Sequence, residues 1–273
     1  MIKILYFINA NQNGENILNR ILSTAFCAVV LGTAGCCMFS GSKEAQCPEE
    51  ISATAVDEVP APEIQAAQSA VHPDSQDWSS LFDLALSNAD FERGVWYIDE
   101  QGRLTADKDE AIWSKREYEN FVLDLEYSCA PAANSGVLIY ATDTKNWIPN
   151  TVEIQIQDDL NNHWDKVDDT WRNGGLFGHC APKVRNVRAA GEWNRMTITA
   201  IGQKIKVAVN GEITVDADLA DWKSATTNPD GSAIPSWLNK PWAEMPTKGK
   251  IGLQGKHGQA TIYFRSIKIK ELK

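Results

Sequence analysis

The chain has 273 residues, a formal net charge of −10 at pH 7 and a pI near 4.9. This acidic balance argues against a nucleic-acid-binding protein, because neutralising phosphates requires clustered Lys and Arg. It also provides no polybasic patch for a membrane surface. A neutral substrate, or one bound through a cation, fits the composition better.

Residues 1–36 have the pattern of an N-terminal extension followed by an export leader. Arg20 precedes an apolar run over residues 21–35, which ends in small residues before Cys36. These features are typical of a cleavable leader, and the run is too short to span a bilayer comfortably. Ala34-Gly35-Cys36 also resembles a bacterial lipobox. We therefore expect a protein exported to the periplasm or cell envelope and held by a lipid anchor at Cys36.

Residues 37–76 are predicted to form a flexible linker. The stretch is rich in Ala, Glu, Pro, Ser and Gln and has few large aliphatic residues. Such a composition cannot bury enough apolar surface to offset the entropy of ordering the chain. The linker would tether a lipid anchor to the folded domain expected over residues 77–273.

Residues 77–273 have the pattern of an all-β domain. Short alternating segments recur with turn signals about every 10 residues, and no long amphipathic helix is evident. Asn210-Gly211 between two such segments predicts a tight hairpin, because both residues tolerate positive φ. The pattern predicts a β-sandwich or jelly roll. The expected strands cover residues 120–128, 135–141, 192–200, 204–209, 212–215, 250–254 and 260–270.

Two further features of this domain predict local structure. Cys129 and Cys180 have no metal-binding spacing, so we expect two separate thiols, with a disulfide as the alternative. The segment Asp216–Trp242 interrupts the strand pattern with prolines, tryptophans and polar residues. It is too long for a hairpin loop, and long ordered loops tend to be functional.

The segment Thr151–Asp159 alternates between apolar and polar residues. Val152, Ile154 and Ile156 would share one face of a strand, and Glu153, Gln155 and Gln157 the other. The apolar face suits a core. The polar face could grip hydroxyls, a sugar or a metal, although a polar strand face that simply meets water is the commoner arrangement.

Six short motifs of the chain follow one another in order: Asn134-Ser135-Gly136-Val137, Val152-Glu153-Ile154-Gln155-Ile156, Gly191-Glu192-Trp193-Asn194, Val209-Asn210-Gly211, Ile251-Gly252-Leu253-Gln254 and the run 262–269. Their order and spacing resemble the 3-keto-disaccharide hydrolase family. The resemblance runs from about Asp77 to Lys270, and it implies a concanavalin A-like jelly roll, frequent export or lipidation, and cleavage of glycosides whose sugar carries a 3-ketone. Tyr140 stands where many members have arginine.

The implied chemistry indicates which side chains would be useful. A ketone at C3 acidifies the proton on C2, so a base can form an enediolate and the group on C1 can leave by elimination; water adds afterwards. This route needs a base near neutrality, a Lewis acid or hydrogen-bond donors for the enolate oxygen, and an acid for the leaving group. We expect Glu153, His163 and His179 to be the catalytic candidates, with a surface role as the alternative for His163.

Substrate contacts and a metal can be predicted in the same way. Glu153, Asp158 and His163 would make an oxygen–nitrogen site for a divalent cation, although no His-x-His or His-Glu-x-x-His spacing supports it. A surface position is the alternative for Lys183, and His257 is expected to be a turn residue. The substrate-binding candidates are Gln155, Gln157, Trp147, Trp164, Tyr140 and Lys183.

Three functions remain open at this point. The first is an exported enzyme that cleaves 3-keto glycosides or disaccharides by C2 proton abstraction, elimination and hydration. The second is a non-catalytic, lectin-like carbohydrate-binding module of the same architecture. The third is an ordinary glycosidase with two carboxylates on either side of the scissile bond.

Overall fold

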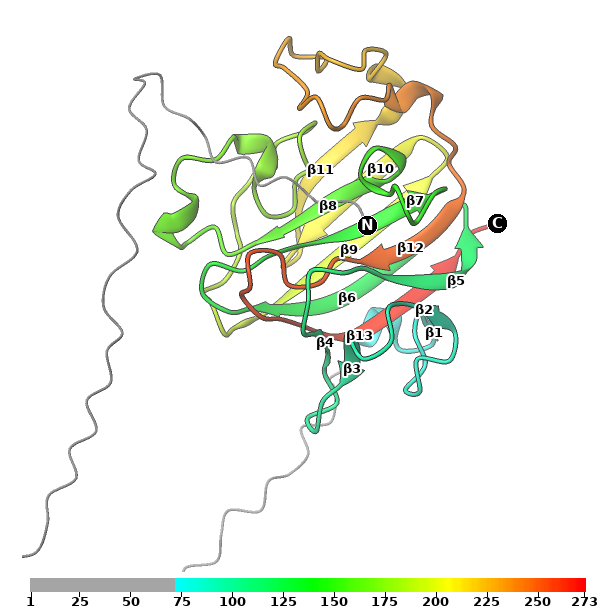
Figure 1. Cartoon of the computed structure of the whole chain (residues 1–273). Coiled ribbons are helices and arrows are strands. Elements are labelled where there is room, and N and C mark those ends of the chain that lie inside the picture. The colour runs from blue at the N-terminus through cyan, green and yellow to red at the C-terminus, as the bar shows by residue number, and fades with distance from the viewer. Residues whose placement is uncertain (1–71) are drawn as a thin grey trace, which may run out of the picture. The chain divides into compact units, whose positions relative to one another are not determined.

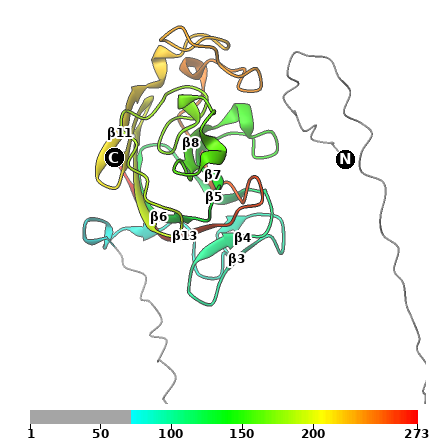
Figure 2. The same ribbon diagram turned by 90° about the vertical axis from the view of Figure 1, so that its left-hand side faces the viewer.

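The computed structural model describes residues 72–273, which form an all-β sandwich of two antiparallel sheets (Figures 1 and 2). The predicted fold class is therefore confirmed. The predicted leader, lipobox and most of the linker lie outside the described residues. Within those residues, no helix is long and apolar enough to cross a membrane.

The described elements are short strands and single turns of 3-10 helix. The strands are β1 (Ser79–Ser80), β2 (Ala89–Asp90), β3 (Trp96–Ile98), β4 (Leu104–Ala106), β5 (Ile112–Tyr118), β6 (Phe121–Cys129), β7 (Asn134–Ala141), β8 (Val152–Gln157), β9 (Trp193–Ile201), β10 (Lys204–Val209), β11 (Glu212–Asp218), β12 (Gly249–Leu253) and β13 (Ile262–Glu271). The 3-10 turns are η1 (Pro73–Ser75), η2 (Ile148–Asn150), η3 (Asn162–Trp164), η4 (Asp169–Trp171), η5 (Leu219–Asp221) and η6 (Trp242–Glu244).

Strands distant in sequence are neighbours in both sheets. The eight-stranded sheet has the order β11-β10-β9-β6-β13-β4-β3, with β1 also paired to β13, and the five-stranded sheet has the order β2-β5-β12-β7-β8. The predicted hairpin is present between β10 and β11, where Asn210 and Gly211 have φ of 51° and 89°. Strand β8 lies at one edge of the five-stranded sheet (Figure 1).

The core lies between the sheets and follows the alternation of the strands. The eight-stranded sheet contributes the fully buried Leu123 and Leu125 of β6 to this core. The five-stranded sheet contributes the fully buried Val152, Ile154 and Ile156 of β8. Because successive side chains alternate, the residues between them point to the outer faces. Glu153 therefore belongs to the outer face of the five-stranded sheet. Cys129 and Cys180 are free thiols, as predicted.

A bulge in β7 overturns the predicted substrate contact at Tyr140. Against β12, Lys250 pairs with Ala141 and Gly252 with Leu138, so two residues of β7 oppose one of β12. Ile139 and Tyr140 consequently both enter the core. Tyr140 is fully buried, and its hydroxyl donates to the carbonyl of Gly202 at 2.9 Å.

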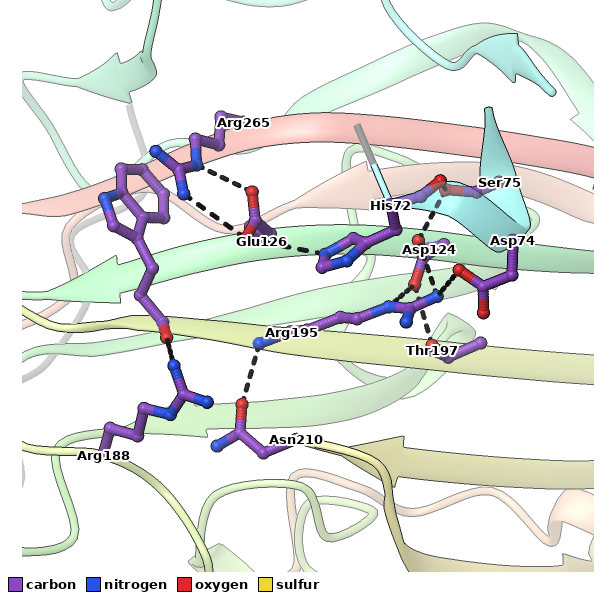
Figure 3. A network of polar contacts seen from close by, with 11 residues as sticks. His72, Asp74, Ser75, Asp124, Glu126, Arg188, Arg195, Thr197, Asn210 and Arg265 are labelled. Atoms are coloured by element: carbon purple, nitrogen blue, oxygen red, sulfur yellow. Dashed lines mark hydrogen bonds and ion pairs between the residues drawn. The ribbon is translucent and has the colours of Figure 1, made fainter. Parts of the chain in front are cut away.

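The N-terminal segment His72–Asp77, here called the strap, is fastened to the outer face of the eight-stranded sheet (Figure 3). The Ser75 hydroxyl donates to Asp124 at 2.9 Å, and Arg195 donates to both Asp124 and Asp74, at 2.8 and 2.5 Å. Asp124 is fully buried. Since a buried carboxylate requires partners, the strap helps to satisfy a charge that the sheet carries. Packed structure therefore begins ahead of Asp77.

Candidate functional site

Glu153 lies on the outer face of β8, directly over a glycine of the neighbouring strand. A Cβ atom added to Gly136 of β7 would collide with the Glu153 carboxylate and lie 2.8 Å from its Cγ. The missing side chain at Gly136 therefore creates the space in which the carboxylate lies. Glu153 as a whole residue is partly exposed.

The surroundings of Glu153 favour its protonated form. Burial raises the pKa of Glu153 from 4.5 to about 8, and the negative charge of Asp109 adds to this, while His257 opposes it. Desolvation disfavours a carboxylate charge, and a nearby positive group favours it. A carboxyl group with a pKa near neutrality can both accept and return a proton under physiological conditions.

His257 and Asp109 form an ion pair beside Glu153. The His257 Nδ1 lies 2.6 Å from Asp109 Oδ2, and this contact raises the pKa of His257 above its usual 6.5. The backbone N–H of His257 also donates to the carbonyl of Asn134, at the start of β7. The sequence predicts a turn residue at His257, and its local pattern gives no signal for Asp109. The pair joins loops 148 residues apart in sequence, which local patterns do not reveal.

The two glutamines of β8 belong to a row of polar side chains anchored by a carboxylate. Gln155 Nε2 donates to Asn134 Oδ1 at 2.9 Å, and Gln157 Nε2 donates to Asp159 Oδ1 at 3.0 Å. Asp159 also accepts the N–H of Asn173. Gln155 Oε1 is buried and has no hydrogen-bond partner within residues 72–273. This unsatisfied acceptor is a position where a ligand hydroxyl or a water molecule could donate.

Beyond Glu153 the same sheet face becomes apolar. Leu138, which pairs with Glu153, packs with Trp113 of β5 and Ala141 of β7, and Trp147 packs against this group. The Trp113 and Trp147 ring centroids are 6.3 Å apart. Trp147 therefore lies on the outer face of the five-stranded sheet, the face that carries Glu153. The face combines a few polar groups with aromatic surface, as is typical of small-molecule sites.

The predicted catalytic residue His179 lies in a packed junction, and no hydrogen bond or ring contact joins its ring to Glu153 within residues 72–273. Its ring stacks on Trp242 with centroids 3.5 Å apart, and its Nδ1 is 2.9 Å from the carbonyl of Phe177. Burial lowers the pKa of His179 to about 4, so the ring is neutral near pH 7. These contacts assign His179 to packing of the long loop that follows β11.

The structure shows no contact between Glu153 and three other predicted residues within the described part of the chain. These residues are His163, Trp164 and Lys183. His163 is exposed in η3 and packs edge-on against Trp164, with centroids 4.4 Å apart. Lys183 is exposed, and its backbone N–H donates to Thr214 of β11. Within the described residues, no hydrogen bond, ion pair or ring contact connects these three side chains to Glu153.

The predicted metal site is not assembled. In residues 72–273, no group of three His, Cys, Asp or Glu side chains could hold a metal ion. Glu153 and Asp158 are five positions apart, and an odd separation along a strand places side chains on opposite faces. Asp158 instead turns inward and accepts the N–H of Ala132 at 2.9 Å. His163 follows in a separate 3-10 turn.

Comparison with known proteins places this chain in a family. No curated protein matches the chain. A candidate glycosyl hydrolase of solved structure from Parabacteroides distasonis ATCC 8503 is 50% identical over 71% of this chain and 99% of its own, with a TM-score of 0.69. A second from the same organism is 21% identical over 69% of this chain and 90% of its own, with a TM-score of 0.58, and supports the fold alone. The family model described as a 3-keto-alpha-glucoside-1,2-lyase-like domain matches residues 77–270, so the chain belongs to that glycosyl hydrolase-like family.

Proposed function

We propose that this protein cleaves 3-keto glycosides at the outer face of the five-stranded sheet, with Glu153 as the base. The observation that carries the proposal is the raised pKa of Glu153, about 8, beside the Asp109–His257 ion pair. Perturbed titratable groups that lie together are typical of active sites. Membership of the lyase-like family supports the same chemistry.

The proposed reaction begins with transfer of the C2 proton to the Glu153 carboxylate. Electrons from the C2–H bond form the enediolate, and the charge on the C3 oxygen is stabilised by an N–H of protonated His257. The enediolate then re-forms the C3 ketone and makes a C1=C2 double bond as the C1–O bond breaks, and the leaving oxygen takes a proton from solvent. Water adds its oxygen to C1 and loses one proton to solvent, while Glu153 returns its proton to C2, so the net reaction is hydrolysis.

Two features suit this face to such a reaction. Asp109 keeps His257 protonated to a higher pH and fixes its ring, so a cationic donor is available while Glu153 ionises. The buried amides of Gln155 and Gln157 are fixed next to the base by their hydrogen bonds to Asn134 and Asp159. Both arrangements exist before substrate arrives, which reduces the reorganisation required in the transition state.

The test is aglycone release from a 3-keto glucoside and from its unoxidised parent, each with and without EDTA. We expect the full chain to cleave the ketone alone and Glu153→Gln to lose at least ~100-fold in kcat. Glu212→Gln, at an exposed glutamate of β11, is the matched control and should retain activity. Binding without cleavage of either compound would identify a lectin-like module, and cleavage of the parent would identify an ordinary glycosidase.

We also propose that the chain is exported and anchored through a lipid on Cys36. The support is the leader pattern of residues 21–36. The full chain should sediment with membranes in a bacterial host, and Cys36→Ala should release it to the soluble envelope fraction. A Cys36→Ala protein that stays with the membrane would contradict anchoring at this residue.

A further inference from the structure

The loop after β11 presents an aromatic surface that the proposed reaction does not use. Trp237 of this loop is 49% exposed. Its ring lies edge-on to Trp171 of η4, with centroids 6.2 Å apart. Trp171 in turn contacts Phe177, with centroids 5.1 Å apart. We call Trp171 and Trp237 the tryptophan platform.

The platform is held in place by buried contacts on its far side. Trp222 and Trp242 pack together with centroids 5.6 Å apart, and Trp242 stacks on His179. Asn228 accepts the indole N–H of Trp222 at 2.9 Å and donates to the carbonyl of Gly178 at 3.3 Å. The loop is therefore fixed to the segment that carries Phe177. A half-exposed tryptophan on a fixed support is pre-organised for binding.

The indole N–H groups of the platform are unused. In the described part of the chain, the buried Trp96 and Trp222 both donate their N–H groups to protein oxygens, at 2.8 and 2.9 Å. Within that same part, neither Trp171 nor Trp237 has such an acceptor, and neither N–H is a buried, unsatisfied atom. The platform therefore offers an apolar ring face together with free hydrogen-bond donors at its edge. A sugar ring matches both, since it has a C–H surface bordered by hydroxyl oxygens.

The platform is connected to the strand of the proposed base. The N–H of Phe177 donates to the carbonyl of Glu153 at 3.0 Å, and Gly174 and Gly175 form backbone hydrogen bonds with Gln155. These bonds place the segment of the platform directly beside the outer edge of β8. The segment between Trp171 and Phe177 is therefore hydrogen-bonded to the strand that carries Glu153.

We propose that the tryptophan platform binds a second sugar residue, the leaving group of a disaccharide substrate. This inference rests on the proposed function, because it places the reacting ring at Glu153. The apolar group around Trp113 and Trp147 is largely covered by its own packing, with Trp113 only 6% exposed. The platform is the more accessible aromatic surface of the two.

The kinetic test compares a 3-keto disaccharide with methyl 3-keto glucoside. Trp237→Ala should raise KM for the disaccharide by roughly 3- to 10-fold, which is the scale of one lost aromatic contact. The kcat for the disaccharide and the KM for the methyl glycoside should change little. Trp237→Phe should restore much of the affinity. Tyr97→Ala, at an aromatic residue of β3 that is 42% exposed, is the matched control. Equal KM values for Trp237→Ala and the unmodified chain would overturn the proposal.

Two further arms separate this inference from the proposed function. Calorimetry with the unoxidised disaccharide and its monosaccharide measures binding affinity without any reaction. Tighter binding of the disaccharide that depends on Trp237 would support a sugar site at the platform even if no ketone were cleaved. A 3-keto phenyl glucoside probes an aromatic leaving group. If Trp237→Ala weakened only the phenyl glucoside, the sugar assignment would be wrong.

Discussion

Replacing Glu153 by glutamine should change how protein stability depends on pH. The glutamine has nearly the same shape but cannot ionise. Below pH 4.5 the carboxyl group is protonated in both the folded and the unfolded chain, so the unmodified protein and the Glu153→Gln variant should differ little in stability. Between pH 4.5 and 8 the unfolded chain releases its proton while the folded chain keeps it. Rising pH in this window should therefore destabilise the unmodified protein relative to Glu153→Gln.

The size of the effect follows from the shift in pKa. A change from 4.5 to about 8 corresponds to about 5 kcal/mol at about 1.4 kcal/mol per unit. The residue keeps some exposure, and solvent screening reduces the value, so we expect a gain of about 2–5 kcal/mol for Glu153→Gln above pH 8. The stability difference between Glu153→Gln and the unmodified protein should be complete above pH 8 and absent below pH 4.5.

Urea unfolding of both proteins at several pH values from about 4 to 9 measures this difference. The Glu212→Gln protein provides the control, because Glu212 is exposed at the start of β11. A stability difference between the unmodified chain and Glu153→Gln that stays constant across this range would refute the reasoning. It would mean that Glu153 ionises at its ordinary pKa and is not matched to proton transfer near neutrality.

Three further outcomes are expected. Asp109→Asn should lower the pKa of His257, measured by NMR titration, and should move the alkaline limb of the kcat/KM profile to lower pH; an unmoved limb would remove His257 from the mechanism. Gly136→Ala should displace the Glu153 carboxylate and reduce kcat while the fold is retained, and unchanged turnover would show that this close approach is not needed. A chain starting at Asp77 should be about 1–3 kcal/mol less stable to urea than one starting at His72, because Asp124 loses a buried partner; equal stabilities would show that the strap is dispensable.

The strands were predictable because their signals are local. The alternation at 152–157 and the Asn210-Gly211 turn give β8 and the β10–β11 hairpin almost at their observed bounds. Tyr140 was misplaced because a bulge depends on the partner strand, and nothing within β7 itself announces that two successive residues enter the core. Alternation predicts a face only where the ladder is regular.

The candidate site was predictable in part. Glu153 follows from the pattern of its own strand, but Asp109 and His257 become its neighbours only when loops after β4 and β12 meet. His179 lies between Gly178 and Cys180 with Pro182 close by, a composition that predicts a shaped loop. Its partner Trp242 comes from the far end of the long loop after β11, so its packing role could be seen only in three dimensions.

The strap determines where a pull on the N-terminus would act. Any chain that precedes His72 joins the domain on the outer face of the eight-stranded sheet, whereas Glu153 belongs to the outer face of the other sheet. Tension on a tether would be borne by the Asp124 and Arg195 contacts before it reached the core. With the proposed anchor and the proposed reaction, the face that carries Glu153 would be the one turned away from the point of attachment.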